Sequence, residues 1–146
     1  METTTTGAET VQWDLTDLYP SRERLEDDLA LADGEADAFD DRYRGQVGAL
    51  DAAALARALR AYEEIQDRLG RAFTYAYLNW STDTGDAARG ALLQRVREAY
   101  TQTAQKLIFF ELEWAAVDDA HAEALLADSA LAGFRHYLEL QRLQKD

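Results

Sequence analysis

Residues 51–80 read DAAALARALRAYEEIQDRLGRAFTYAYLNW. Large apolar and aromatic residues recur in this stretch every three, four or seven positions, which is the spacing of one face of an α-helix. Asp51 is a residue type that caps helix starts, and polar Gln66 interrupts the apolar face. A helix of about 30 residues would be roughly 45 Å long. The face consists of Leu55, Leu59, Tyr62, Leu69, Phe73, Ala76 and Trp80.

Two further long helices are predicted on either side of residues 51–80. The first spans residues 21–43, with Ser21 as its N-cap and with Gly45 and Gly48 after its end. The other spans residues 86–116 and follows a short loop, which favours an antiparallel hairpin with residues 51–80. The predicted apolar faces are Leu25, Leu29, Ala32, Ala36, Phe39 and Tyr43 in the first helix, and Leu93, Val96, Tyr100, Leu107, Phe110 and Trp114 in the other.

The two ends of the chain complete the predicted fold. A short helix should run from residues 118–119 to Leu126, and a last helix should start at residues 128–129. At the other end we expect a disordered tail over residues 1–12 and an extended arm over residues 13–20, because Pro20 pushes the preceding residue toward extended geometry. The sequence therefore predicts an all-α fold, a helical bundle built on a long antiparallel helix hairpin with an extended N-terminal arm.

Composition excludes several classes of function. The chain has 146 residues, and 15 Lys and Arg residues against 28 Asp and Glu residues give a net charge of −13. This balance argues against binding nucleic acid or an anionic membrane, since both need a basic surface. No apolar run approaches the length of a membrane span, and no cysteine provides a thiolate. We expect one acidic, cytoplasmic domain.

No catalytic or metal-binding motif is present in the sequence. His121 and His136 are its two histidines, and neither begins an H-E-x-x-H sequence or belongs to a Glu-x-x-His pair. Glu111 and Glu113 lie two positions apart and would point about 200° away from each other on a helix, so they form no acid/base pair. Both are expected to be solvated carboxylates or to contact a neighbouring helix.

Five segments in order resemble oligoendopeptidase F, a zinc metallopeptidase of the thimet-oligopeptidase type. They extend over residues 13–139. They are the opening Trp13-Asp14-Leu15-Thr16-Asp17-Leu18-Tyr19-Pro20; Phe39 with Tyr43, Arg44 and Gly45; Tyr75-Ala76-Tyr77-Leu78 with Ser81-Thr82-Asp83-Thr84; Phe109-Phe110-Glu111-Leu112-Glu113-Trp114; and Leu131 with Phe134-Arg135-His136-Tyr137-Leu138-Glu139.

The resemblance implies that residues 13–146 are the N-terminal helical lobe of such an enzyme. In that family this lobe forms one wall of a channel that admits short peptides. The zinc and the catalytic Glu belong to a catalytic lobe that is absent here, so no catalytic, cofactor-binding or metal residue is assigned to this chain. The implied partners are the missing lobe of the same polypeptide and the short peptide substrates of the parent enzyme.

Two other interpretations remain open. The chain could be a free-standing acidic helical adaptor that binds a protein partner through the exposed faces of the long hairpin. It could also be the helical lobe of a homologue whose active site is lost.

The last predicted helix is the best candidate for a contact with the missing lobe. Its apolar residues lie around more than one side, and a helix that is apolar on two sides needs two neighbours. We therefore expect contacts with the other lobe or the peptide channel from His136, Tyr137, Leu140 and Leu143. In the isolated domain the same surface would favour self-association.

Overall fold

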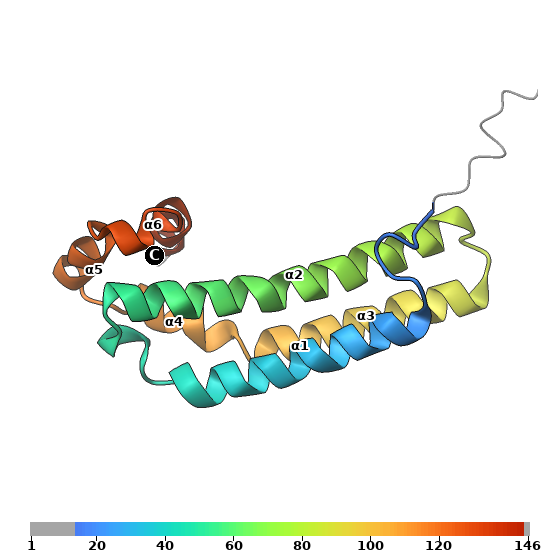
Figure 1. Ribbon diagram of the computed structural model, residues 1–146, viewed down its shortest axis with the longest axis horizontal. Helices are drawn as coiled ribbons and strands as arrows, with labels where there is room; N and C mark the ends of the chain where they lie inside the picture. Colours follow the sequence, from blue (N-terminus) through green and yellow to red (C-terminus); the bar gives the residue numbers. More distant parts are fainter. Residues whose placement is uncertain (1–13, 145–146) are drawn as a thin grey trace, which may run out of the picture.

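Three long helices form an elongated bundle in the computed structural model, which describes residues 14–144 (Figure 1). They are α1 (Arg22–Tyr43), α2 (Ala52–Thr82) and α3 (Ala87–Gln105), and each contacts the other two. The described residues contain no strand, so the predicted all-α class and the long hairpin of α2 and α3 are confirmed. The predicted tail over residues 1–12 and Trp13 lie outside the described residues.

The first two long helices begin directly after their predicted capping residues, and α3 begins directly after Asp86, where its helix was predicted to start. A side-chain oxygen of the N-cap accepts a hydrogen bond from a free backbone N–H of the first turn, which a helix start otherwise leaves without a partner. Ser21 accepts from the Arg24 amide at 3.3 Å, and Asp51 accepts from the Ala54 amide at 2.8 Å. Asp86 caps α3 by accepting from the amides of Ala88 and Arg89.

One hydrophobic core runs along the bundle and into the helices at its end. All six residues of the predicted α1 face are buried. On α2 the predicted leucines are buried, whereas Tyr62, Phe73 and Trp80 are only partly covered and Ile65 is an additional core residue. The helix spacing thus identified the buried side of both helices, and on α2 the large aromatic residues lie at its margin.

The predicted helix over residues 86–116 is wrong as a single element. It is divided into α3 and α4 (Ile108–Ala115), with a tight turn at Lys106 and Leu107. The Lys106 ammonium lies 2.8 Å from carboxylate oxygens of Asp33 and Asp37 on α1, and Leu107 is buried. These contacts with a distant part of the chain hold the turn. The sequence contains no sign of it, because the apolar spacing continues through residues 100–114 without a Gly or Pro.

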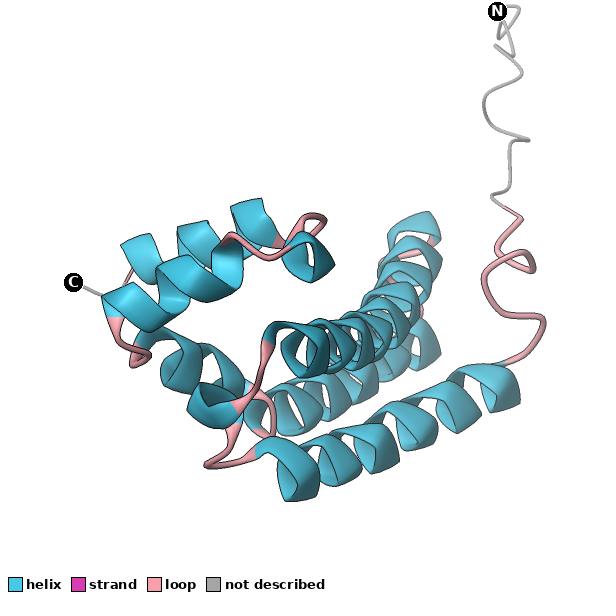
Figure 2. Ribbon diagram, turned by 60° about the vertical axis from the view of Figure 1, so that its left-hand side comes forward, coloured by secondary structure: helices cyan, strands magenta, loops and turns pink. Residues whose placement is uncertain are grey.

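The C-terminal part also differs from the prediction. The short helix α5 (Asp119–Leu126) is present as expected, but the last helix does not start at residues 128–129. Asp128 instead caps a single 3₁₀ turn, η3 (Ser129–Leu131), and α6 runs only over Arg135–Leu143. Gly133 lies between the two elements, and glycine is a poor residue for a helix interior. Figure 2 shows these helices grouped at one end of the bundle.

The described part of the arm, residues 14–20, bends through a turn and then packs on the bundle. The Tyr19 side chain is 5% exposed, and its hydroxyl donates a 2.5 Å hydrogen bond to the buried carboxylate of Asp28 on α1. Arg68 of α2 donates to the other oxygen of that carboxylate at 2.9 Å. Burial, followed by the bond to Asp28, raises the pKa of Tyr19 above its ordinary value. The tyrosine therefore fixes the arm through a protonated hydroxyl.

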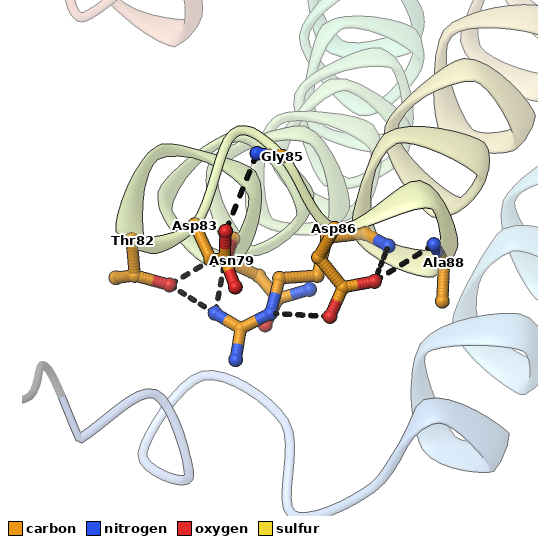
Figure 3. A network of polar contacts seen from close by, with 7 residues as sticks. Asn79, Thr82, Asp83, Gly85, Asp86 and Ala88 are labelled. Atoms are coloured by element: carbon orange, nitrogen blue, oxygen red, sulfur yellow. Dashed lines mark hydrogen bonds and ion pairs between the residues drawn. The ribbon is translucent and has the colours of Figure 1, made fainter.

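At the same end of the bundle as the arm, Arg89 joins the end of α2 to the start of α3. Figure 3 shows its partners Asn79, Thr82 and Asp86 in this polar network. One guanidinium nitrogen of Arg89 donates to the carbonyl of Asn79 at 3.0 Å and also to the hydroxyl of Thr82. Its Nε lies 3.5 Å from the carboxylate of Asp86. These contacts hold the short loop of the hairpin in one conformation and engage the charge of Arg89.

We predict that Tyr19→Phe lowers the free energy of unfolding by about 1.5–3 kcal/mol, the range for a hydrogen bond to a charged group. The ring still fills its place, so the change isolates the bond to Asp28. Urea unfolding followed by circular dichroism measures the difference. Tyr77→Phe is the matched control, because the Tyr77 side chain is 45% exposed. Coincident curves for the wild type and Tyr19→Phe would show that the bond contributes nothing.

Candidate interaction surface

The α4 helix has a buried side and an exposed apolar side. Phe109, Phe110 and Trp114 are buried in the core. Ile108 and Leu112, four positions apart on one face of the helix, are 52% and 65% exposed. An eight-residue helix with this composition presents apolar surface both to the core and to solvent.

The α6 helix is held on α4 by polar contacts around one tryptophan. The indole N–H of Trp114 donates to the Leu138 carbonyl of α6 at 2.9 Å. Arg142 donates back to the Trp114 carbonyl at 3.0 Å, and its guanidinium lies 5.4 Å from the centre of the Trp114 ring. Because each helix donates to a backbone carbonyl of the other, the position of α6 along α4 is fixed.

Glu111 of α4 joins α2 and α6 through one carboxylate oxygen. The Tyr62 hydroxyl of α2 donates to this oxygen at 3.1 Å, and the Tyr137 hydroxyl of α6 donates to it at 3.0 Å. Burial raises the pKa of both tyrosines, and the negative charge of Glu111 raises it further, as does the neighbouring phenol in the case of Tyr137. Both phenols therefore remain protonated donors well into alkaline pH.

Glu113 points to a different neighbour. Its two carboxylate oxygens accept hydrogen bonds from the backbone amides of Gly45, at 2.8 Å, and Val47, at 3.3 Å. Gly45 has a φ of +77°, a conformation that glycine adopts at little cost. Glu113 thus closes the turn after α1. Glu111 contacts two neighbouring helices, which is one of the two expectations for this pair, whereas Glu113 contacts a turn.

The four predicted contact residues all lie on α6, but they do not share one side of it. His136, Leu140 and Leu143 follow the spacing of a single helix face, and all three are exposed, Leu143 by 77%. Tyr137 instead turns toward Glu111 and is half-buried. Three of the predicted residues therefore share one exposed face of α6, and the fourth, Tyr137, contacts Glu111 of α4.

Ile108 and Leu112 were missed as surface residues. The sequence contains the signal, because residues 107–110 and 112 are all apolar and no single helix face can bury them all. Together with Leu140 and Leu143, they make up four of the six large hydrophobic residues that are exposed within residues 14–144. We call Ile108, Leu112, His136, Leu140 and Leu143 the α4–α6 surface.

The described residues do not fit a zinc site. No group of three His, Cys, Asp or Glu side chains in residues 14–144 is arranged to hold a metal ion. His121 and His136 are both exposed and lie on different helices. None of the helices described here is long and apolar enough to cross a membrane.

We predict that Tyr137→Phe lowers the free energy of unfolding by about 1 kcal/mol at neutral pH. In the variant, the free energy of unfolding should also fall less steeply at high pH than in the wild type. The raised pKa of Tyr137 means that its folded form keeps the proton while the unfolded form ionises, so stability is full below about pH 10 and falls above it. Urea unfolding between pH 7 and 11 measures the slope. The exposed Tyr77→Phe is the control, and parallel pH profiles for wild type and Tyr137→Phe would contradict the prediction.

Comparison with known proteins gives one informative similarity. The chain is 28% identical over 128 residues to "Oligopeptidase PepF" of Bacillus subtilis (strain 168). The aligned part covers 87% of this chain but 19% of that protein, so the chain spans about a fifth of the length of this relative. No family model and no solved structure matches the chain. The similarity supports a distant relationship to Oligopeptidase PepF and hence to a peptidase-related domain.

Proposed function

We propose that this chain is the N-terminal helical lobe of an oligoendopeptidase F-like zinc metallopeptidase. In this role it forms part of the wall of a channel that admits short peptides to the active site. It does not itself hydrolyse them, and the zinc and catalytic groups belong to the remaining part of the enzyme. The single observation that carries the proposal is the similarity over 128 residues to a much longer oligopeptidase.

The α4–α6 surface supplies the proposed contact with the rest of the enzyme. Exposed leucines and isoleucine from two helices that contact each other would be covered by the second lobe, which would gain the free energy of removing them from water. His136 on the same surface adds a side chain that can donate or accept a hydrogen bond across such a contact. Hydrogen bonds from Tyr62 and Tyr137 to Glu111 hold α6 in place, and α6 carries His136, Leu140 and Leu143.

A chimaeric enzyme tests the proposal. The segment of Bacillus subtilis Oligopeptidase PepF that aligns with this chain is replaced by this chain, and hydrolysis of a quenched fluorescent peptide is followed. We expect the chimaera to hydrolyse the peptide, a deletion of the aligned segment to be inactive, and the isolated 146-residue chain to be inactive. A folded chimaera that retains zinc but does not hydrolyse the peptide would contradict the proposal.

A double substitution in the chimaera examines the contact surface. Leu140→Glu with Leu143→Glu should remove most of the activity, because two carboxylates would be buried against the other lobe at a large free-energy cost. Leu31→Glu is the matched control, since Leu31 is 48% exposed on α1, outside the α4–α6 surface. Equal activity of the two chimaeras would show that the α4–α6 surface does not contact the rest of the enzyme.

The isolated chain should associate with itself through the same surface. Exposed apolar patches of several hundred Å² tend to find partners. We expect sedimentation over a wide range of concentration to show a rising average mass. Leu140→Glu with Leu143→Glu should give a monomer, whereas Leu31→Glu should behave like the wild type. A monomeric wild type at every concentration would contradict this prediction.

A further inference from the structure

Glycines interrupt two of the three long helices at places where packing does not require them. Gly34 lies inside α1 and Gly70 lies inside α2. A side-chain carbon added at either glycine would meet no atom within 4 Å, so no neighbour excludes a larger residue. Glycine is a poor residue for a helix interior, because it leaves the backbone more freedom than any other residue. Each helix therefore contains one point that bends more easily than the residues around it.

The third long helix ends beside Gly34. The turn between α3 and α4 places the Lys106 ammonium 2.8 Å from carboxylate oxygens of Asp33 and Asp37, which lie on either side of Gly34 along α1. Because α3 gives way to α4 at this turn, the third helix is also interrupted here.

An ion pair places Gly70 next to the same region. Arg68 of α2, two positions before Gly70, has its Nε 2.9 Å from a carboxylate oxygen of Glu35, the residue after Gly34. Since a helical turn takes 3.6 residues, the two glycines and the α3–α4 turn lie within about two turns of one another along the bundle. We call the part of the bundle at Gly34, Gly70, Lys106 and Leu107 the glycine level.

On the α1 and α3 sides, small side chains form the core at the glycine level. The buried residues of α1 on either side of Gly34 are Ala32 and Ala36, and the last two buried residues of α3 are Ala99 and Thr103. Thr103 also donates a hydrogen bond to Asp33 at 3.0 Å. Light apolar packing and ion pairs between partly exposed side chains are features of regions that deform at a low free-energy cost.

We propose that the bundle bends at the glycine level, so that the end with the arm moves relative to the end with α4, α5 and α6. Gly34 and Gly70 would absorb the change in backbone angles, as hinge residues do. The flexible Lys106 side chain can keep one of its two carboxylate partners while it leaves the other. The bend changes the direction in which the α4–α6 surface faces, and it does not depend on the proposed function.

Distances between pairs of spin labels on the isolated 146-residue chain test the proposal. The sequence has no cysteine, so two introduced cysteines carry the only labels. Labels at Arg57→Cys on α2 and Ala91→Cys on α3 lie on opposite sides of the glycine level, and labels at Arg24→Cys on α1 and Ala91→Cys lie on one side of it. All three positions are exposed. We expect a broader distance distribution for the first pair, and equal widths for the two pairs would overturn the proposal.

Substitution of the glycines should stiffen the bundle. Gly34→Ala combined with Gly70→Ala should narrow the distribution of the pair that spans the glycine level, and the open space at both positions lets these variants fold. Gly90→Ala is the matched control, because Gly90 lies inside α3 but near its start. An unchanged width in the double variant, or equal narrowing by Gly90→Ala, would overturn the proposal.

Amide hydrogen exchange distinguishes a bend of the whole bundle from a local effect on one helix. The amides of Leu107 and Phe110 donate within the α3–α4 turn, to the carbonyls of Ala104 and Leu107. If the helices bend together, Gly34→Ala should slow exchange of these two amides about five-fold, the factor of one glycine-to-alanine change in a helix interior. Gly90→Ala again serves as the control for a general gain in stability. Equal exchange of these amides in both variants would overturn the proposal.

Discussion

The short helix α4 is the constraint on which the arrangement of this protein depends. Within eight residues it places Phe110 and Trp114 in the core, Glu111 between two tyrosines, and Glu113 on the amides that follow α1. Aromatic contacts reinforce this position, because the Phe110 ring lies 5.4 Å from Phe39 of α1 and 5.3 Å from Tyr62 of α2. A displacement of α4 would therefore break contacts with α1, α2 and α6 together.

Paired carboxylates organise much of the structure of this very acidic chain. Asp28 accepts from Tyr19 and Arg68, and Lys106 lies between Asp33 and Asp37. The hydrogen bond from Lys106 lowers the pKa of Asp33, so this carboxylate favours the folded state above its ordinary pKa and loses that effect as the pH falls. The arm, the α3–α4 turn and the hairpin loop are each fixed by such a group.

The two ends of the bundle differ in chemistry. One end carries the exposed aliphatic residues of α4 and α6, together with an exposed histidine. The other end carries a cavity lined by the arm and the end of α2, where two aspartates and Arg89 are among the lining residues. An elongated bundle keeps the two surfaces apart.

The sequence alone determined where the three long helices begin, where α1 and α2 end, and which side of α1 is buried, because helix spacing and capping are local properties. It also predicted α5, and it singled out α6 as an apolar helix with an exposed side. These features depend on neighbours within a few residues, which the sequence contains directly.

Only the tertiary structure decided the rest. The α3–α4 turn depends on Lys106 reaching carboxylates of α1, about 70 residues away, while the local apolar spacing continues without interruption. Helix spacing alone puts Tyr137 off the face of His136, Leu140 and Leu143, but only the fold shows that its hydroxyl donates to Glu111 of α4. The cavity formed because the arm folds back onto the end of α2. Contacts between distant segments have no local period, so no pattern in the sequence specifies them.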